Sequence, residues 1–136
     1  MNVSIRAIQA IMENAIEDGK NVRVGNIERA LGYYRCSWGE EFSKVTGLSP
    51  ASYMRYFRMR CICQDLATSK HSLLDISEYY GRSLSYFCRD FKKLIGMTPG
   101  EYRNLNHNGR VIVLHSVFSA YPFLTDFTSF RPLLLK

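Results

Sequence analysis

Residues 84–93 place cationic and polar side chains at helical spacing on one face of a predicted helix. Phe87 and Phe91 are four residues apart, so they would be buried together on the other side of that helix. The outward residues are then Leu84, Ser85, Cys88, Arg89 and Lys92. Arg89 carries a forked guanidinium that can donate to O6 and N7 of guanine together. The cations better placed for phosphate groups are Arg82, Lys92 and Lys93.

A second copy of this segment lies 49 residues earlier in the chain. Residues 32–53 align with residues 81–102 without a gap, and glycine, proline and aromatic positions coincide. The matched pairs are Gly32 with Gly81, Phe42 with Phe91, Lys44 with Lys93, Gly47 with Gly96, Leu48 with Met97, Ser49 with Thr98, Pro50 with Pro99 and Tyr53 with Tyr102. Because a solenoid needs about three copies, we infer a duplicated supersecondary unit instead.

Each copy predicts two short helices separated by a tight turn. The first helix is expected to begin at an N-cap residue, Asn26 or Asp75, and to end at a glycine. The second helix, 35–46 or 84–95, repeats apolar residues at i, i+4 and i+7. The expected buried positions are Trp38, Phe42 and Val45 in one copy and Phe87, Phe91 and Leu94 in the other. This arrangement is a helix-turn-helix.

A long amphipathic helix, residues 50–68, is predicted between the two copies. Its apolar residues recur every three to four positions, and its arginines, Arg55, Arg58 and Arg60, are expected on its flanks. At 1.5 Å per residue this helix is about 27 Å long. Together with a helix at 4–18, the pattern predicts an all-α chain of about seven helices up to residue 103.

The end of the second copy, Ser85 to Lys93 followed by Gly96-Met97-Thr98-Pro99 and Tyr102-Arg103, resembles the signature of the AraC/XylS transcription regulators. The resemblance covers about residues 4–103 and implies two DNA-binding helix-turn-helix units joined by a long helix. It also implies a small stand-alone regulator, since the chain has no room for the small-molecule ligand domain that many members carry. We therefore divide the chain into a first unit (1–49), a linker helix (50–68), a second unit (69–103) and a C-terminal extension (104–136).

The first copy differs from the second at its outward positions. These are Arg35, Cys36, Gly39, Glu40 and Ser43. Gly39 lies in the middle of the predicted helix, where glycine costs about 1 kcal/mol relative to alanine. Glu40 stands where the second copy has Arg89, and phosphates repel a carboxylate, although it can accept from N4 of cytosine. We expect the second unit to supply more of the affinity for DNA.

Composition and charge agree with a nucleic-acid partner and argue against several other classes. The 136 residues carry a net charge of +6, and residues 55–103 hold +4 of it, whereas residues 1–54 are neutral. No apolar run reaches the roughly 18 residues of a membrane span, and the N-terminus lacks a signal-peptide pattern. We therefore expect a cytoplasmic protein with no membrane partner. No spacing of a nucleophile with its base, and no glycine-rich phosphate loop, predicts an enzyme.

The cysteines and the C-terminal extension carry no clear motif. Cys36, Cys61, Cys63 and Cys88 form no CxxC pair, so we expect reduced thiols, no metal site and no cofactor. The extension begins with a polar linker, 104–108, and continues into a β-branched run, 111–118. The sequence leaves open whether it is an appendage packed on the helices, a partner or dimer surface, or a poorly ordered tail.

Two functions remain in competition. The first is a sequence-specific activator that binds double-stranded DNA as a monomer, with its two second helices in successive major grooves of an asymmetric site near 20 bp. RNA polymerase is then an expected further partner, and dimerisation through the extension is an alternative to the monomer. The second function is a protein-binding antagonist that keeps the fold but binds DNA weakly, which Gly39, Glu40 and the apolar extension favour.

Overall fold

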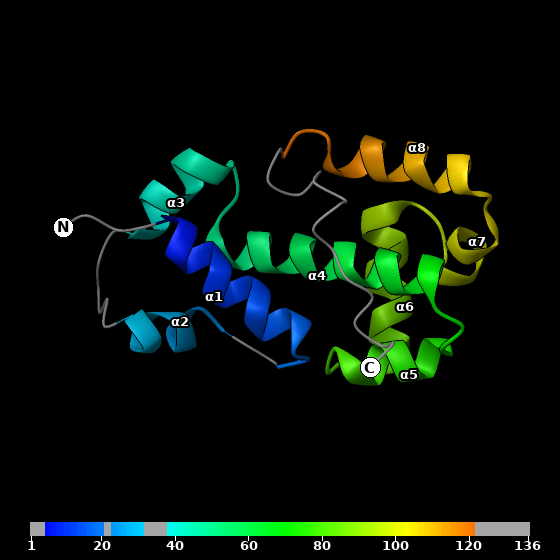
Figure 1. Ribbon diagram of the computed structural model, residues 1–136, viewed down its shortest axis with the longest axis horizontal. Coiled ribbons are helices and arrows are strands. Elements are labelled where there is room, and N and C mark those ends of the chain that lie inside the picture. The colour runs from blue at the N-terminus through cyan, green and yellow to red at the C-terminus, as the bar shows by residue number, and fades with distance from the viewer. Residues whose placement is uncertain (1–4, 21–22, 32–37, 122–136) are drawn as a thin grey trace. The chain divides into compact units, whose positions relative to one another are not determined.

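The computed structural model describes residues 5–20, 23–31 and 38–121, whose helices are labelled in Figure 1. All regular structure in these ranges is helical, which confirms the all-α prediction. The helices are α1 (Ile5–Glu17), α2 (Val24–Leu31), α3 (Trp38–Thr46), α4 (Pro50–Thr68), α5 (Leu73–Tyr79), α6 (Leu84–Ile95), α7 (Pro99–Asn104) and α8 (His107–Phe118). The bounds of α4 and α6 are those expected from the sequence, whereas residues 32–37 lie outside the described ranges.

The chain forms two compact units, Met1–Arg58 (unit 1) and Met59–Lys136 (unit 2). The division falls inside α4, so this helix contributes its first half to unit 1 and its second half to unit 2. Within unit 1, α1 packs against α2 and α3. Within unit 2, α6 packs against α5, α7 and α8. The helix that carries the predicted DNA-binding face is therefore held by three neighbours.

Unit 1 is built around a buried aromatic cluster. The ring of Phe42 meets those of Trp38 and Tyr53 edge to face, with centroid distances of 6.1 and 5.2 Å. All three side chains are buried, which confirms the core placement of Trp38. The Tyr53 hydroxyl accepts a hydrogen bond from Gln9 Nε2 at 3.2 Å and donates to Glu13 Oε2 at 2.9 Å. These bonds satisfy a polar group that would otherwise be costly to bury.

Unit 2 repeats this cluster 49 residues later. Phe91 lies 6.3 Å from Phe87 and 5.7 Å from Tyr102, measured between ring centroids, and all three side chains are buried. A second buried contact joins the Tyr80 hydroxyl to Asp65 Oδ2 at 2.7 Å. Burial together with the nearby Asp65 carboxylate raises the pKa of Tyr80, so its hydroxyl stays protonated and donates.

The turns between helices repeat as well. Gly47 and Gly96 both have positive φ, 81° and 92°, a conformation that favours glycine after a helix. Ser49 and Thr98 then cap the following helices, because each side-chain oxygen accepts the backbone N–H three residues later. The structure thus confirms the duplicated unit in its stops and caps.

The predicted N-cap residues Asn26 and Asp75 are wrong by three positions. The N-cap of α5 is Ser72, whose hydroxyl accepts from the backbone N–H of Asp75 at 3.0 Å. Asn26 lies inside α2, and its side chain accepts from the backbone N–H of Arg23 at 2.9 Å. In both helices the hydrogen bond at the N-terminus joins residues three positions apart, and the accepting side chain can belong to the first or to the second of them. Residue type alone therefore did not locate the cap.

The third buried position of the second helices is also corrected. Val45 is 50% exposed, and Thr46 is buried in its place, with its hydroxyl donating to Phe42 O at 2.8 Å. In the second copy Leu94 is half-buried and Ile95 is buried. The buried spacing is therefore i, i+4, i+8 rather than i, i+4, i+7, and both spacings fit a helix face.

The central helix α4 is not amphipathic. Arg60, expected on a flank, is only 2% exposed, and Met59 and Cys63 on other sides of the helix are buried too. Arg55 and Arg58 are half-buried. A helix that is enclosed on most sides has to bury residues of several kinds, and an arginine stem supplies apolar surface for that packing.

The C-terminal extension begins with a helix. The N-cap of α8 is Asn106, whose side chain accepts from Gly109 N at 2.7 Å. The expected polar linker at 104–108 is therefore wrong, since α8 begins at His107 and includes the β-branched run. Phe118 near its end is fully buried, so the described part of the extension is packed as an appendage. Residues 122–136 lie outside the described ranges.

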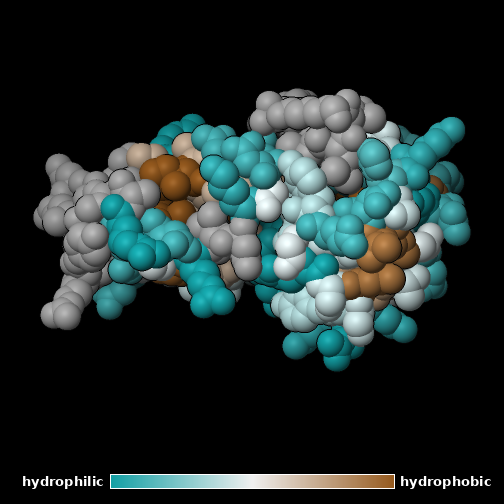
Figure 2. Space-filling model, turned by 90° about the horizontal axis from the view of Figure 1, so that it is seen from below, coloured by the Kyte–Doolittle hydropathy of each residue, from teal (hydrophilic) through white to brown (hydrophobic). Residues whose placement is uncertain are grey.

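Most of the surface seen in Figure 2 is hydrophilic, and hydrophobic atoms form separate small patches. The large apolar side chains with most exposure are Val45, Leu74, Leu84, Tyr86, Val111 and Ile112. Single exposed apolar residues of this kind are ordinary. Among the described helices, none has the length and apolar character needed to cross a membrane.

Candidate nucleic-acid interface

The helix α6 is fixed at both ends by local hydrogen bonds. Ser83 is its N-cap, and its hydroxyl accepts from Tyr86 N at 3.2 Å. Gly96 ends the helix in the left-handed conformation and donates its N–H to Lys92 O. Lys92 and Lys93 occupy the last turn, where the helix dipole favours cations. The exposed face of α6 is thus presented by a helix with defined ends.

The residues predicted for the DNA-binding face of α6 are accessible. Phe87 and Phe91 are buried, as expected, and the opposite side of the helix is open. The exposed residues are Leu84, Ser85, Arg89, Lys92 and Lys93, and Cys88 and Arg82 are half-buried. Their exposure permits contact with DNA, and the contact itself stays a prediction.

The C-terminal half of this face forms a shallow hollow of about 450 Å³. It is lined by Cys88, Arg89, Lys92, Lys93 and Thr98. Three of these five residues are cations and none is acidic, so the hollow attracts anions. The nearby Glu101 carboxylate accepts from Thr98 N at 3.1 Å, and this bond and the one from the Thr98 hydroxyl hold the pKa of Glu101 below its usual value.

Two residues at this face were missed by sequence reasoning. Tyr86 is 45% exposed, and the Arg82 guanidinium lies 5.8 Å from its ring centroid, which is a cation–π contact. Thr98 lines the hollow in addition to capping α7. The spacing of Tyr86 to Arg89 and Lys93, at i, i+3 and i+7, could have revealed the first, since such residues share one helix face.

The matching helix of unit 1 presents a different surface. Glu40 and Glu41 are exposed in the first turn of α3. Gly39 is half-buried, and Ser43 is half-buried with its hydroxyl donating to Gly39 O at 2.9 Å. Gly39 is the second residue of α3 as described, because residues 35–37 lie outside the described ranges. The predicted site residues Arg35 and Cys36 fall in that gap.

The described cysteines do not form a reactive or metal-binding cluster. Cys61 and Cys63 are buried free thiols, and burial raises the pKa of Cys63. Among the described residues no three His, Cys, Asp or Glu side chains could hold a metal ion together.

Comparison with known proteins agrees with this architecture. A family model described as a helix-turn-helix domain matches residues 27–105, more than half of the chain. "Multiple antibiotic resistance protein MarA" of Escherichia coli (strain K12) is 29% identical over 114 residues, which are 83% of this chain and 88% of that protein. The "uncharacterized HTH-type transcriptional regulator YbfP" of Bacillus subtilis (strain 168) is 33% identical over 101 residues, 72% of this chain. The match spans only 34% of that longer regulator.

Solved structures show the same fold. The C-terminal domain of the two-component response regulator yesN from Fusobacterium nucleatum is 26% identical, with a TM-score of 0.65. That alignment covers 73% of this chain and 96% of the other. The C-terminal domain of AraT, a response regulator from Geobacillus stearothermophilus, has a TM-score of 0.66 at 17% identity, over 76% of this chain and 94% of the other. The chain belongs to the AraC/XylS-type helix-turn-helix family of DNA-binding transcription regulators.

Proposed function

We propose that this protein activates transcription by binding an asymmetric DNA site as a monomer, with α6 of unit 2 supplying most of the affinity. The observation that carries the proposal is the cationic hollow on α6, lined by Arg89, Lys92 and Lys93 without any acidic side chain. An exposed, capped helix of this kind fits the major groove of B-DNA. The similarity to MarA, which extends over 88% of that protein, supports the assignment of two helix-turn-helix units.

The exposed residues of α6 divide into two roles. Arg89 reads guanine, since its guanidinium is exposed and can donate to O6 and N7 together. Arg82, Lys92 and Lys93 contact phosphates, which position the protein without specifying sequence. Leu84 is 40% exposed at the start of the helix and can contact a thymine methyl group.

In this proposal α3 enters the next major groove, about one helical turn away, which gives a site near 20 bp. Its exposed Glu40 and Glu41 weaken attraction to the phosphates, so α3 adds less to the affinity than α6 does. As an activator, the protein would also contact RNA polymerase.

Selection of genomic fragments bound by the purified protein, followed by sequencing, tests the specificity. Affinity for the selected site and for scrambled duplex is then measured at several salt concentrations. We expect the affinity to fall steeply with salt, because phosphate contacts release counterions. Lys92→Ala should weaken both duplexes alike and make the salt slope shallower by about one. Lys70→Ala is the matched control, since Lys70 is also exposed in unit 2 but does not line the hollow.

The acidic surface of α3 favours one alternative, a protein-binding antagonist that keeps the fold. Glu40 is exposed where α6 carries Arg89, and the neighbouring Glu41 is exposed as well. Under this alternative no genomic site is enriched, and the residual affinity for duplex is the same for selected and scrambled sequences. Enrichment of one sequence motif would exclude it.

A further inference from the structure

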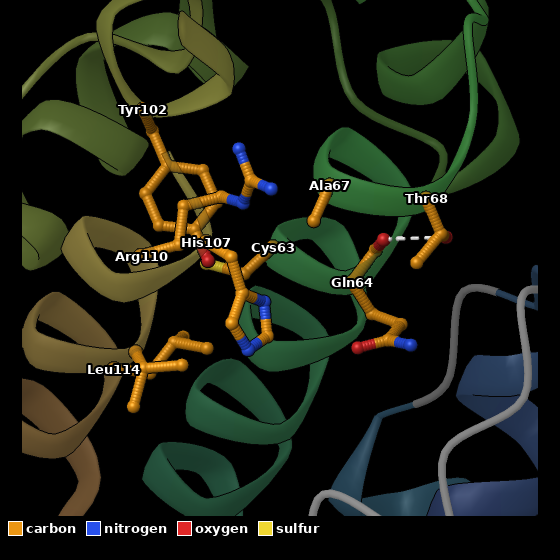
Figure 3. Close-up of a pocket in the computed structure, with 9 residues that line it drawn as sticks. Cys63, Gln64, Ala67, Thr68, Tyr102, His107, Arg110 and Leu114 are labelled. Atoms are coloured by element: carbon orange, nitrogen blue, oxygen red, sulfur yellow. Dashed lines mark hydrogen bonds between the residues drawn. The ribbon is translucent and has the colours of Figure 1, made fainter. Parts of the chain in front are cut away.

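A pocket of about 440 Å³ lies within unit 2, between the second half of α4 and the helices α7 and α8. Figure 3 shows Cys63, Gln64, Ala67 and Thr68 on the α4 side, facing residues of the other two helices. Its volume is within the range of small-molecule sites. It shares no lining residue with the cationic hollow on α6, so it is a second and separate site.

One wall of the pocket contains a buried hydroxyl that lacks an oxygen or nitrogen partner. Tyr102 is 0% exposed, and its hydroxyl makes no such hydrogen bond within the described part of the chain. Figure 3 shows this oxygen beside the Cys63 sulfur, which is only a weak acceptor. Burial raises the pKa of both groups, so the thiol is neutral and the phenol keeps a proton to donate.

The duplicated unit shows what this hydroxyl needs. Tyr53 occupies the position in unit 1 that matches Tyr102, 49 residues earlier. The Tyr53 hydroxyl donates to the carboxylate of Glu13 at 2.9 Å. In unit 2 the corresponding tyrosine lines the pocket with its hydroxyl beside the Cys63 sulfur, and no lining residue is acidic. A carboxylate supplied from outside the chain would complete unit 2 as Glu13 completes unit 1.

Two further side chains make the pocket suited to an anion. Arg110 is held in place because its Nη1 donates to the carbonyls of Arg103, at 3.3 Å, and Leu105 at the end of α7. Arg110 and Tyr102 both line the pocket, and the positive charge of Arg110 acts to lower the pKa of the Tyr102 hydroxyl. His107 adds a ring nitrogen at the α4-facing side of α8, as Figure 3 shows.

The remaining lining is mixed, since Gln64 and Thr68 of α4 are polar. Ala67 of α4 and Val111 and Leu114 of α8 contribute carbon surface. A ligand that satisfies both parts has a negatively charged head and a short hydrophobic body.

We propose that this pocket binds a small amphipathic carboxylate, with the carboxylate at the Tyr102 hydroxyl and Arg110 and the hydrocarbon against Ala67, Val111 and Leu114. Because the Tyr102 ring packs against Phe91 of α6 at 5.7 Å, the ligand is one side chain away from the DNA-binding helix. The exposed face of α6 remains open to DNA when the pocket is filled, since the two sites share no residue.

Calorimetric titration of the full chain with octanoate tests the proposal, with acetate and 1-octanol as comparison ligands. We expect saturable binding of one octanoate per chain and binding of 1-octanol that is weaker by about tenfold or more, because the alcohol cannot form the charged hydrogen bonds. Acetate, which lacks the hydrocarbon body, should give no measurable binding. Absence of octanoate binding to the folded protein, or equal affinity for 1-octanol, would overturn the proposal.

Variants locate the site. Tyr102→Phe removes only the hydroxyl and should weaken octanoate by about tenfold. Ala67→Phe fills the pocket from an exposed helix position and should abolish binding. Ala51→Phe is the matched control, the same change at an exposed position of α4 outside the pocket, and should bind as the wild type does. Circular dichroism checks that each variant is folded. If Ala67→Phe does not fold, Tyr102→Phe decides, and unchanged affinity in that variant contradicts the assignment.

Discussion

The helices α3 and α6 occupy the same place in the two copies of one duplicated unit, yet their exposed faces have opposite character. Their buried residues correspond, with Phe42 matching Phe91 and Thr46 matching Ile95. Their exposed residues correspond only in part, because Lys44 matches Lys93 but Glu40 of α3 stands where α6 has Arg89. The interior of the unit restricts which residues can be buried, whereas the exposed face is restricted only by what it binds. The same fold can therefore carry a cationic exposed face in one unit and exposed glutamates at the matching helix of the other.

The hydrogen bonds that stabilise the two units also differ at matching positions. Tyr53 in unit 1 donates to Glu13, whereas the matching Tyr102 in unit 2 faces a pocket. The cap of α7 is a reciprocal pair between Thr98 and Glu101. These differences lead to matched pairs of substitutions, one in each unit.

The largest effect is expected where the two units agree. Phe42→Ala and Phe91→Ala each remove a fully buried ring that contacts two other aromatic residues, so each should lower the free energy of unfolding by about 3–5 kcal/mol. Chemical denaturation followed by circular dichroism measures the loss. Val45→Ala serves as the control, because Val45 is 50% exposed and its loss should cost less than about 0.5 kcal/mol. A loss below about 1 kcal/mol in either phenylalanine variant would contradict its place in the core.

The next effect concerns the faces that differ. Arg89→Ala should weaken binding to the selected DNA site by about 1–3 kcal/mol and relax the preference at one base pair. Glu40→Ala, the matched change in α3, should instead tighten binding to scrambled duplex, because a charge that repels phosphate is removed. Equilibrium binding of both variants to selected and scrambled duplex separates the two outcomes.

Two results would change this interpretation of the faces. If Glu40 accepts from a cytosine, Glu40→Ala loses specificity at that base, and α3 reads DNA directly. If Arg89→Ala leaves both affinities unchanged, α6 is not the main reading helix and the site assignment fails.

Local signals made the duplicated fold predictable. Gly47 and Gly96 stand where the backbone has positive φ, and the phenylalanines lie at equal spacing on a buried helix face. Both features can be recognised in the repeated sequence without knowledge of tertiary contacts. The outward face of α6 followed from its buried face, which is why Arg89 and Lys92 were placed on the exposed side.

The errors arose where tertiary contacts decide. Arg60 is buried because other elements enclose α4, and no local pattern in the sequence reports that enclosure. The pocket beside Tyr102 depends on α8, which is formed by a β-branched run whose helical state was not evident from its composition. Tyr86 was missed because only the residues opposite Phe87 were counted as exposed. A helix that is buried along one side leaves most of its circumference exposed to solvent, and Tyr86 lies on that exposed part.

A smaller effect should distinguish the two matched tyrosines. Tyr53→Phe removes a hydroxyl bonded to Gln9 and to the Glu13 carboxylate, so it should lower the free energy of unfolding by about 1–2 kcal/mol. Tyr102→Phe removes a buried hydroxyl without an oxygen or nitrogen partner, so stability should change by less than about 0.5 kcal/mol or increase. Denaturation of both variants without added ligand measures the difference, and equal losses would show that Tyr102 has a partner that completes its hydrogen bonding.

The smallest effect is expected at the helix caps. In unit 2 the Thr98 hydroxyl accepts from Glu101 N, and the Glu101 carboxylate accepts from Thr98 N, each at 3.1 Å. In unit 1 the Ser49 hydroxyl accepts from the matching Ser52 N at 3.2 Å, but serine carries no carboxylate to return the bond. Thr98→Ala should therefore cost about 1 kcal/mol of unfolding free energy, and Ser49→Ala should cost less.

The two caps should also differ in their dependence on pH. Hydrogen bonds from Thr98 lower the pKa of Glu101 from its usual 4.5, so the carboxylate stabilises the folded state fully above about pH 4.5. This contribution is lost as the pH falls through the lowered pKa, because the folded state then has to take up a proton at the cap. Glu101→Gln keeps an acceptor for the Thr98 N–H but cannot titrate, so the stability difference between this variant and the wild type should change only below about pH 4.5. Thermal unfolding between pH 7 and pH 3 measures that difference. A difference that stays constant over this range would show that the Thr98 bonds do not favour the ionised form of Glu101.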